Sequence, residues 1–183
     1  MFAQIATFLI DTLVSFFVFL LLARFYFQWL RISFRNQIGE FVIALTNWIV
    51  LPARRAVPGL AGLDLASLLI AWVIQGLALW AQAKIVGQDL TPLAVIAQAG
   101  VDLVRYSIQL LVFAVIVAVA LSWLNPDSPV APVFDLMTRP FLRPLRRVVP
   151  PAGRFDLSPL VLLVILYVIL IPLAYLRLAA GLL

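Results

Sequence analysis

The chemistry open to this 183-residue chain is narrow, because it contains no histidine and no cysteine. Imidazole bases, thiolate nucleophiles, disulfides and zinc sites built from these residues are therefore excluded. The eight acidic residues are scattered, and no glycine-rich loop precedes Lys-Ser or Lys-Thr. We therefore expect no enzymatic activity, no cofactor and no metal site.

Arginine supplies 12 of the 13 basic residues, and its clearest pattern is a pair of arginines followed by an aspartate. The pattern occurs twice, as Arg54, Arg55 and Asp64 and as Arg146, Arg147 and Asp156. In a structural interpretation, each aspartate caps the helix that follows it and an arginine pairs with it, which anchors the loop. In a functional interpretation, the arginines bind lipid headgroups or a partner, because guanidinium groups bind phosphate as well as carboxylate. Both interpretations stay open, and Arg143 belongs to the second.

The chain also contains an internal duplication, in which the matching positions of the two copies are 92 residues apart. Segment 52–58 matches segment 144–150, and Thr46 matches Thr138. We therefore divide the chain into two repeats, 1–90 and 91–183. Each repeat holds a span, a basic loop and a second span, so the repeats are parallel rather than inverted.

Four segments are apolar enough to position these loops at a membrane. Hydrophobic residues make up 65% of the chain and charged residues 11%, whereas a soluble domain has about 45–50% apolar residues. The segments lie at about 9–30, 65–83, 107–124 and 157–176, and roughly 20 helical residues cross a bilayer core. We expect the third helix to begin early, with Thr91 as N-cap and Pro92 at its first position. The predicted fold class is an all-α membrane protein with four transmembrane helices.

Four spans place the long loops, 31–62 and 125–156, on the same side of the membrane. These loops carry Arg31, Arg35, Arg54, Arg55, Arg139, Arg143, Arg146, Arg147 and Arg154. The opposite side carries only Lys84, Arg105 and Arg177. Because basic loops stay in the cytoplasm, we expect the long loops inside and both termini outside.

Each long loop contains a segment with an apolar stripe at helical spacing. The first stripe is Ile38, Phe41, Val42, Leu45, Trp48 and Ile49, with Thr46 and Asn47 mostly on the opposite face. The second stripe is Val130, Val133, Phe134, Met137 and Phe141, with Asp135 and Arg139 on its polar side. Such helices lie in the headgroup plane or pack against the bundle, and both alternatives stay open. We expect Pro52 and Pro144 to end them.

Two polar residues fall deep inside the predicted spans. Arg24 either extends toward the cytoplasmic headgroups or faces the bundle interior and pairs with an acid or a carbonyl. Its counterpart in the second repeat is Ala118, so the arginine is not duplicated. Gln75 is more typical of a hydrogen bond between helices than of a pore ligand.

The motifs resemble a known family. Leu-Arg-Pro-Leu-Arg-Arg-Val-Val-Pro from Leu142, then Gly-Arg-Phe-Asp-Leu-Ser-Pro before the last span, is similar to the YggT (YlmG-type) integral membrane proteins. So is Leu-Leu-Ala-Arg ending at Arg24, closely followed by Gln-Trp. The first copy departs from the pattern at Trp48 and Ser67, which stand where the second copy has proline.

The resemblance implies a location in the bacterial inner membrane and a process rather than a reaction. It implies links to osmotic or envelope stress, ion homeostasis, and division or nucleoid distribution. We expect a scaffold or regulatory factor that contacts anionic headgroups and protein partners, or a second copy of itself. The alternatives are an oligomeric ion channel or transporter and a division or nucleoid factor. Direct nucleic-acid binding is not expected, because aromatic residues do not alternate with the arginines, and no small-molecule substrate is indicated.

Overall fold

The computed structural model describes residues 1–57, 59, 62–149 and 156–182. Within those residues the helices are α1 (Phe2–Trp29), α2 (Gln37–Ala56), α3 (Leu65–Ile85), α4 (Pro92–Leu124), α5 (Ala131–Val148) and α6 (Ser158–Ala180). Four of them, α1, α3, α4 and α6, are long and apolar enough to cross a membrane. The all-helical fold class and the four spans are therefore confirmed.

Helix α4 is much longer than the span predicted within it. Its 33 residues extend about 50 Å at 1.5 Å per residue, whereas the hydrocarbon core is about 30 Å thick. It begins as predicted, with Pro92 in the first turn and the Thr91 side chain accepting a hydrogen bond from the Ala94 N–H at 3.1 Å. Asp102 consequently lies within α4, in the part of the helix that precedes the predicted span at 107–124.

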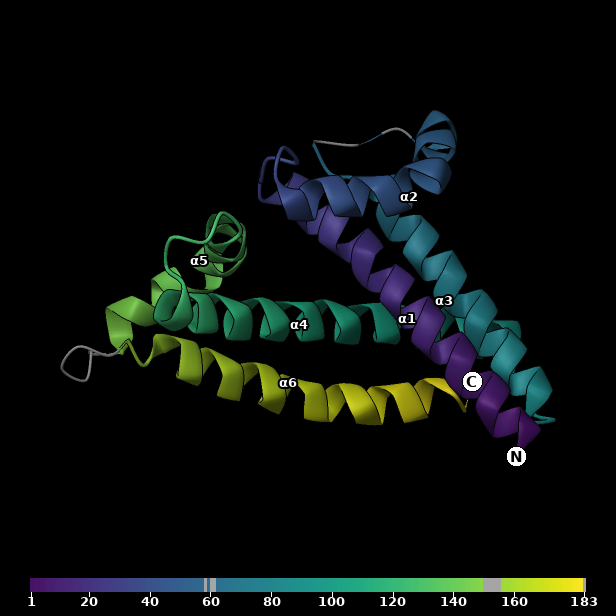
Figure 1. Ribbon diagram of the computed structural model, residues 1–183. Coiled ribbons are helices and arrows are strands. Elements are labelled where there is room, and N and C mark those ends of the chain that lie inside the picture. Colours follow the sequence, from purple (N-terminus) through teal and green to yellow (C-terminus); the bar gives the residue numbers. More distant parts are fainter. Residues whose placement is uncertain (58, 60–61, 150–155, 183) are drawn as a thin grey trace.

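The long helices form two hairpins. Helix α1 packs along α3, and α4 packs along α6, while α4 also contacts α1 and α3 and so joins the hairpins. Figure 1 shows the two termini at one end of the molecule, with α2 and α5 at the other end. This arrangement is what two consecutive hairpins require, because each hairpin returns the chain to the side from which it entered.

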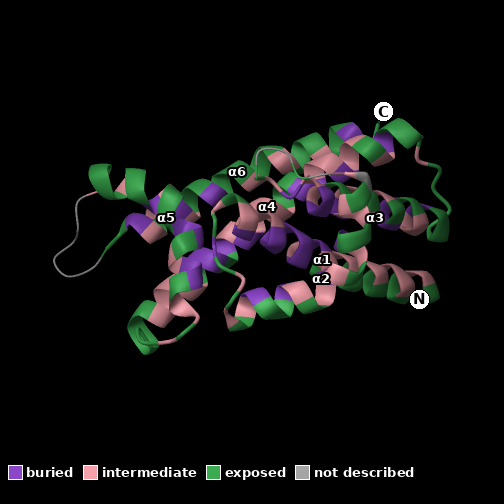
Figure 2. Cartoon of the chain, turned by 90° about the horizontal axis from the view of Figure 1, so that it is seen from above, coloured by how far each residue is buried: buried purple, intermediate pink, exposed green. Residues whose placement is uncertain are grey.

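Buried residues concentrate where the hairpins meet, and the N-terminal end of α1 is largely uncovered (Figure 2). Leu21, Leu22 and Phe27 of α1 are almost completely buried. By contrast, large apolar side chains of α6 are more than half exposed, including Leu160 and Ile171. An apolar surface this extensive is typical of contact with lipid rather than water.

Helices α2 and α5 pack against the hairpins at the end away from the termini. Helix α2 contacts α1 and α3, and α5 contacts α4 and α6. The α5 stripe packs against the bundle, which is one of the two alternatives left open by the sequence, and Val133, Phe134 and Met137 are buried. The α2 stripe was partly wrong: Trp48 is 68% exposed, whereas Thr46 is fully buried. Thr46 faces inward because a buried cation on α1 requires a polar partner there.

The expectation that prolines end these two helices is wrong. Pro52 lies inside α2 and Pro144 inside α5, and the helices continue to Ala56 and Val148. A proline removes its own N–H, and with it one backbone hydrogen bond, and its ring crowds the carbonyl four residues earlier. Hydrogen bonding continues beyond both prolines, from the Val57 and Val149 N–H groups to carbonyls four residues earlier, at 2.8 Å each. The last turns of α2 depart from the direction of its first part (Figure 1).

Candidate functional site

The most extensive polar arrangement is centred on Asp64, directly before α3. We call it the Asp64 cluster, and its members are Arg24, Gln28, Thr46, Asn47, Arg54, Asp64 and Ser67. Asp64 is the N-cap of α3, and its carboxylate accepts hydrogen bonds from the Ser67 N–H at 3.4 Å and the Ser67 hydroxyl at 2.7 Å. The aspartate therefore caps the helix as the sequence predicted, although it is almost wholly buried.

Arg24 faces this carboxylate from α1. Its Nε donates to Asp64 Oδ2 at 3.2 Å, and its Nη1 donates to Thr46 Oγ1 and Asn47 Oδ1 at 2.8 Å each. The Thr46 hydroxyl in turn donates to the Val42 carbonyl at 2.6 Å. Because α2 covers it, Arg24 is only 3% exposed. Extension toward the headgroups was thus the wrong alternative, and pairing with an acid inside the bundle is what the structure contains.

Arg54 approaches the same carboxylate from α2. Its Nη2 lies 2.6 Å from Asp64 Oδ2 and its Nε 3.2 Å from Oδ1, which is a two-point contact. The Nη2 group also donates to Gln28 Oε1 of α1 at 2.9 Å. The Arg54 side chain remains 37% exposed. One carboxylate is thus shared by two guanidinium groups, so the cluster joins α1, α2 and α3 and carries a net charge of +1.

The electrostatics of the cluster keep Asp64 ionised. Burial on its own raises the pKa of a carboxyl group, because it penalises the charged form. The hydrogen bonds from Arg54 and Ser67, together with the Arg54 charge, outweigh burial and hold the pKa of Asp64 below its ordinary value. The negative charge that holds both arginines is therefore present at neutral pH.

The equivalent arrangement in the second repeat is smaller and more exposed. Arg146 Nε lies 2.8 Å from Asp156 Oδ2, and the two side chains are 49% and 42% exposed. The N-cap of α6 is Leu157, so Asp156 stands one residue before it, and its Oδ1 accepts the Ser158 N–H at 2.9 Å. Burial raises the pKa of Asp156, but Ser158 and Arg146 outweigh it and the pKa falls below its ordinary value. The duplicated motif thus gives one buried cluster and one surface ion pair.

The other arginines of α5 divide into paired and unpaired groups. Arg139 Nη2 lies 2.7 Å from Asp135 Oδ2, four residues earlier on the exposed side of the helix. Arg143 and Arg147 are exposed, and within the described part of the chain neither forms an ion pair or a hydrogen bond. Arg55 of α2 is in the same state among the described residues. Arg154, which the sequence places with the basic loop residues, lies outside the described residues.

A second buried acid was not singled out from the sequence. Asp102 of α4 is 2% exposed, and its Oδ2 accepts a hydrogen bond from Gln75 Nε2 of α3 at 3.0 Å. Its Oδ1 accepts from Arg177 Nε of α6 at 2.7 Å. Gln75 therefore bonds between helices, as expected. The available signal was the acid itself, eleven residues into the helix that Thr91 and Pro92 begin.

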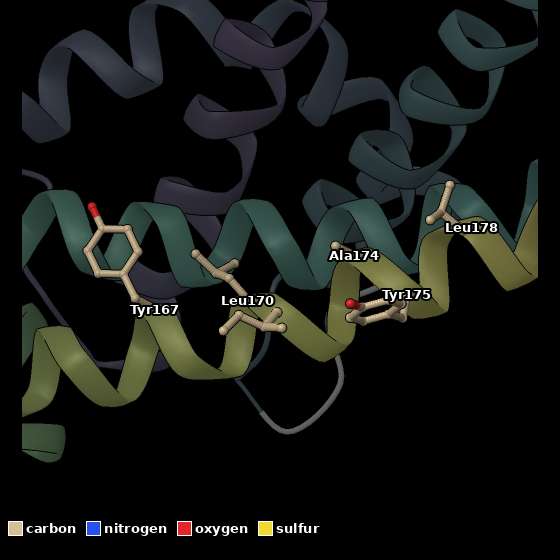
Figure 3. Close-up of a pocket in the computed structure, with 6 residues that line it drawn as sticks. Tyr167, Leu170, Ala174, Tyr175 and Leu178 are labelled. Carbon is tan, nitrogen blue, oxygen red and sulfur yellow. The ribbon is translucent and has the colours of Figure 1, made fainter.

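The described residues contain no group of three acidic side chains placed to hold a metal ion. A surface hollow of about 540 Å³ is lined by α6 alone, between Tyr167 and Leu178. Figure 3 shows its labelled side chains extending from that single helix. A hollow with one wall does not enclose a ligand, so we treat it as part of the outer surface of α6. A second space, between several helices, is described below.

Comparison with known proteins identifies relatives over almost the whole length. A family model described as CCB3/YggT matches twice, at residues 3–85 and 97–177. Uncharacterized protein YggT of Escherichia coli K12 is 35% identical over 177 residues, which cover 96% of this chain and 92% of that protein. An uncharacterized protein of Pseudomonas aeruginosa is 31% identical over 159 residues, covering 85% of this chain and 81% of its own length. No solved structure matches the chain.

Proposed function

Because the chain belongs to the CCB3/YggT family, we propose that it is a multi-pass protein of the bacterial inner membrane that acts as a scaffold or regulatory factor. Its process is the response to osmotic or envelope stress and the associated ion homeostasis. Its cytoplasmic face consists of α2 and α5, whose arginines bind anionic lipid headgroups and acidic partner proteins. Both termini are then periplasmic.

One observation carries this proposal: α5 is held by its apolar face and presents arginines that nothing in the described chain neutralises. Val133 and Met137 are buried against the bundle, whereas Arg143 and Arg147 are exposed. A basic residue near an anionic membrane surface contributes about 1 kcal/mol to binding. Arginine also binds phosphate oxygens with two parallel hydrogen bonds.

The Asp64 cluster supports the proposal from inside the fold. Within the cluster, Arg24 and Arg54 hydrogen-bond to Asp64, and Arg54 also bonds to Gln28. These bonds fix α2 to α1 and α3. These two arginines therefore act in positioning, and binding is left to the exposed arginines, Arg55 on α2 and Arg143 and Arg147 on α5. The anchoring interpretation and the binding interpretation of the arginine motif thus apply to different residues.

An ion channel is less well supported by the same contacts. A conduction path needs polar groups that face a common passage. Here Arg24 bonds to Asp64, Thr46 and Asn47, and Gln75 bonds to Asp102. Arg24 and Gln75 are thus both hydrogen-bonded within the bundle. We expect reconstituted protein to conduct no ions above empty liposomes, and conductance abolished by Arg24→Ala would overturn the scaffold assignment.

Lipid selectivity in reconstituted vesicles tests the proposal. Brominated phosphatidylglycerol or phosphatidylcholine quenches the tryptophan fluorescence of the protein according to how often each lipid contacts it. We expect wild-type protein to prefer phosphatidylglycerol. The double variant Arg143→Gln/Arg147→Gln should lose about 2 kcal/mol, or roughly a tenfold to thirtyfold preference.

Two comparisons sharpen this result. The preference should fall at high salt, since exposed charges are screened. The matched variant Arg105→Gln, which removes an exposed arginine from α4, should retain the preference. An unchanged preference in the double variant would reject headgroup binding by α5.

A further inference from the structure

An apolar groove of about 430 Å³ lies between four helices, α1, α4, α5 and α6. Its walls include Tyr26 of α1, Ile108 and Leu111 of α4, Phe141 of α5, and Ile165 and Leu166 of α6. The volume is within the range of about 300–1,000 Å³ typical of ligand sites. Unlike the hollow on α6, this groove has walls from both hairpins.

The lining of the groove follows the axes of two helices. It extends along α4 from Val104 to Leu111 and along α6 from Leu162 to Ile169. Seven residues of helix correspond to about 10 Å. Met137 and Phe141 of α5 also line the groove. The groove is therefore lined both by the helix that carries the unpaired arginines and by the apolar spans, and an apolar lining of this kind suits part of a hydrocarbon chain.

The charges of α5 are distributed unevenly about this groove. At 3.6 residues per turn, Arg147 lies about 80° around the helix from Met137 and about 120° from Phe141, the two α5 residues that line the groove. Arg143 lies about 120° from Met137 and about 160° from Phe141, and Arg139 and Arg146 lie about 140–180° from these residues. Arg139 and Arg146 are paired, with Asp135 and with Asp156. Arg143 and Arg147 have no ion pair among the described residues, and Arg147 lies nearest the groove lining.

We propose that the groove binds one acyl chain of an anionic phospholipid, whose phosphate is held by Arg143 and Arg147. This inference rests on the proposed function and adds a single defined site to it. The apolar lining recognises the chain, and the two guanidinium groups at the α5 end supply the positive charge that the phosphate requires. Phosphatidylglycerol meets both requirements.

A lipid bound in the groove should stabilise the contact between the two hairpins. Tyr26 and Leu30 belong to the first hairpin, whereas the α4, α5 and α6 walls belong to the second. A chain in the groove therefore contacts both hairpins and fills the space between them. Since a ligand that binds only the folded state stabilises it, phosphatidylglycerol should raise the thermal stability of the protein.

Native mass spectrometry after titration with phosphatidylglycerol or phosphatidylcholine of the same chain length tests the site. We expect wild-type protein to retain one phosphatidylglycerol molecule, whereas glycerol phosphate, which has no chain, is not retained. Ile165→Phe, which fills the groove from α6, should weaken retention of the first lipid at least tenfold. Ser107→Phe, which fills it from α4, should do the same.

Matched variants separate this site from general contact with lipid. Ile171→Phe makes the same change on the outer surface of α6 and should retain the lipid, as should Arg139→Gln. Arg143→Gln/Arg147→Gln should remove the preference for phosphatidylglycerol over phosphatidylcholine.

The failures of the two proposals are distinguishable. If both groove-filling variants retain lipid as well as Ile171→Phe does, the groove site is wrong, and headgroup binding by α5 still stands if the arginine variant loses its preference. If the arginine variant keeps its preference, the proposed function itself fails. Retention of glycerol phosphate by wild-type protein would also overturn the groove site, because it would show that the chain is not needed.

Discussion

Asp64 illustrates how a single buried acid can fix the position of two cations. It is 1% exposed and contacts both Arg24 and Arg54. A buried ion pair contributes little net stability compared with an apolar replacement, but removing one partner leaves an uncompensated charge that costs several kcal/mol. With two arginines and one aspartate, the cost depends on which charge is removed.

We predict that Asp64→Asn destabilises the protein far more than Arg24→Gln does. Asn at position 64 leaves two adjacent arginines without a counter-ion, at a cost of about 3–5 kcal/mol. Gln at position 24 leaves the neutral pair Arg54–Asp64 and keeps an amide near Thr46 and Asn47, so the cost is about 1–2 kcal/mol. Thermal unfolding in detergent micelles measures both. Equal losses would contradict the shared-carboxylate geometry.

Wild-type protein and the Asp64→Asn variant should differ in how their stability responds to acid. The pKa of Asp64 is lower in the folded protein than its ordinary value, which is about 3.9 in an unfolded chain. Its contribution to stability is therefore complete above that unfolded pKa and is lost as the pH falls through the folded pKa. Wild-type protein should lose melting temperature below about pH 4, and Asp64→Asn should lose less over the same interval.

Part of this residue-level detail was predictable. The sequence indicated that Asp64 caps a helix, that Gln75 bonds between helices, and that Arg24 is unusual. It did not select the partners of Arg24, because Thr46 appeared to belong to the polar face of α2. A periodicity argument assigns polar side chains to solvent and has no means of recognising a cation on another helix.

At the scale of elements, α2 and α5 show how a helix with internal prolines can continue. Each proline leaves one backbone carbonyl without its helical partner, yet the following residues still bond to carbonyls four positions earlier. Both helices thereby carry their arginine pairs on their last turn. The rule that proline ends a helix failed here because packing against the bundle stabilises the turns on either side of it.

We predict that Arg54 and Arg55, although adjacent, differ in their effect on the docking of α2. Arg54 bonds to Asp64 and Gln28, whereas Arg55 is exposed. Arg54→Gln should cost about 1.5 kcal/mol, the lower end for a charged hydrogen bond, because the side chain is partly exposed. Arg55→Gln should change stability little.

Hydrogen exchange of the amides in the last turns of α2 measures the docking of α2 directly. Arg54→Gln should exchange faster there, and Arg55→Gln should exchange as wild type does. Similar exchange in the two variants would remove the anchoring role of Arg54.

At the scale of the whole molecule, the two hairpins are joined chiefly through α4. Asp102 on this helix binds Gln75 of the first hairpin and Arg177 of its own. The duplication, the four spans and the family resemblance were all readable from the sequence and are confirmed. The Asp102 contacts were not, because Asp102 and Arg177 are 75 residues apart and neither belongs to the repeated motif.

The duplication also conceals a difference between the halves. Arg24 has Ala118 as its counterpart, so the first repeat buries its aspartate under two arginines while the second leaves Asp156 exposed. Arg143 and Arg147 of α5 have no ion pair among the described residues, and in our proposal they bind lipid beside the groove that Met137 and Phe141 line. The proposed function therefore assigns anchoring to the first repeat and lipid binding to the second.

Thiol labelling of single-cysteine variants tests the central claim most directly, since the chain has no cysteine of its own. In spheroplasts, an impermeant reagent should label Gln88→Cys, between α3 and α4, and should leave Glu40→Cys of α2 and Asp127→Cys, before α5, unlabelled until the membrane is permeabilised. Labelling of either Glu40→Cys or Asp127→Cys in sealed spheroplasts would contradict two parallel hairpins that present α2 and α5 to the cytoplasm.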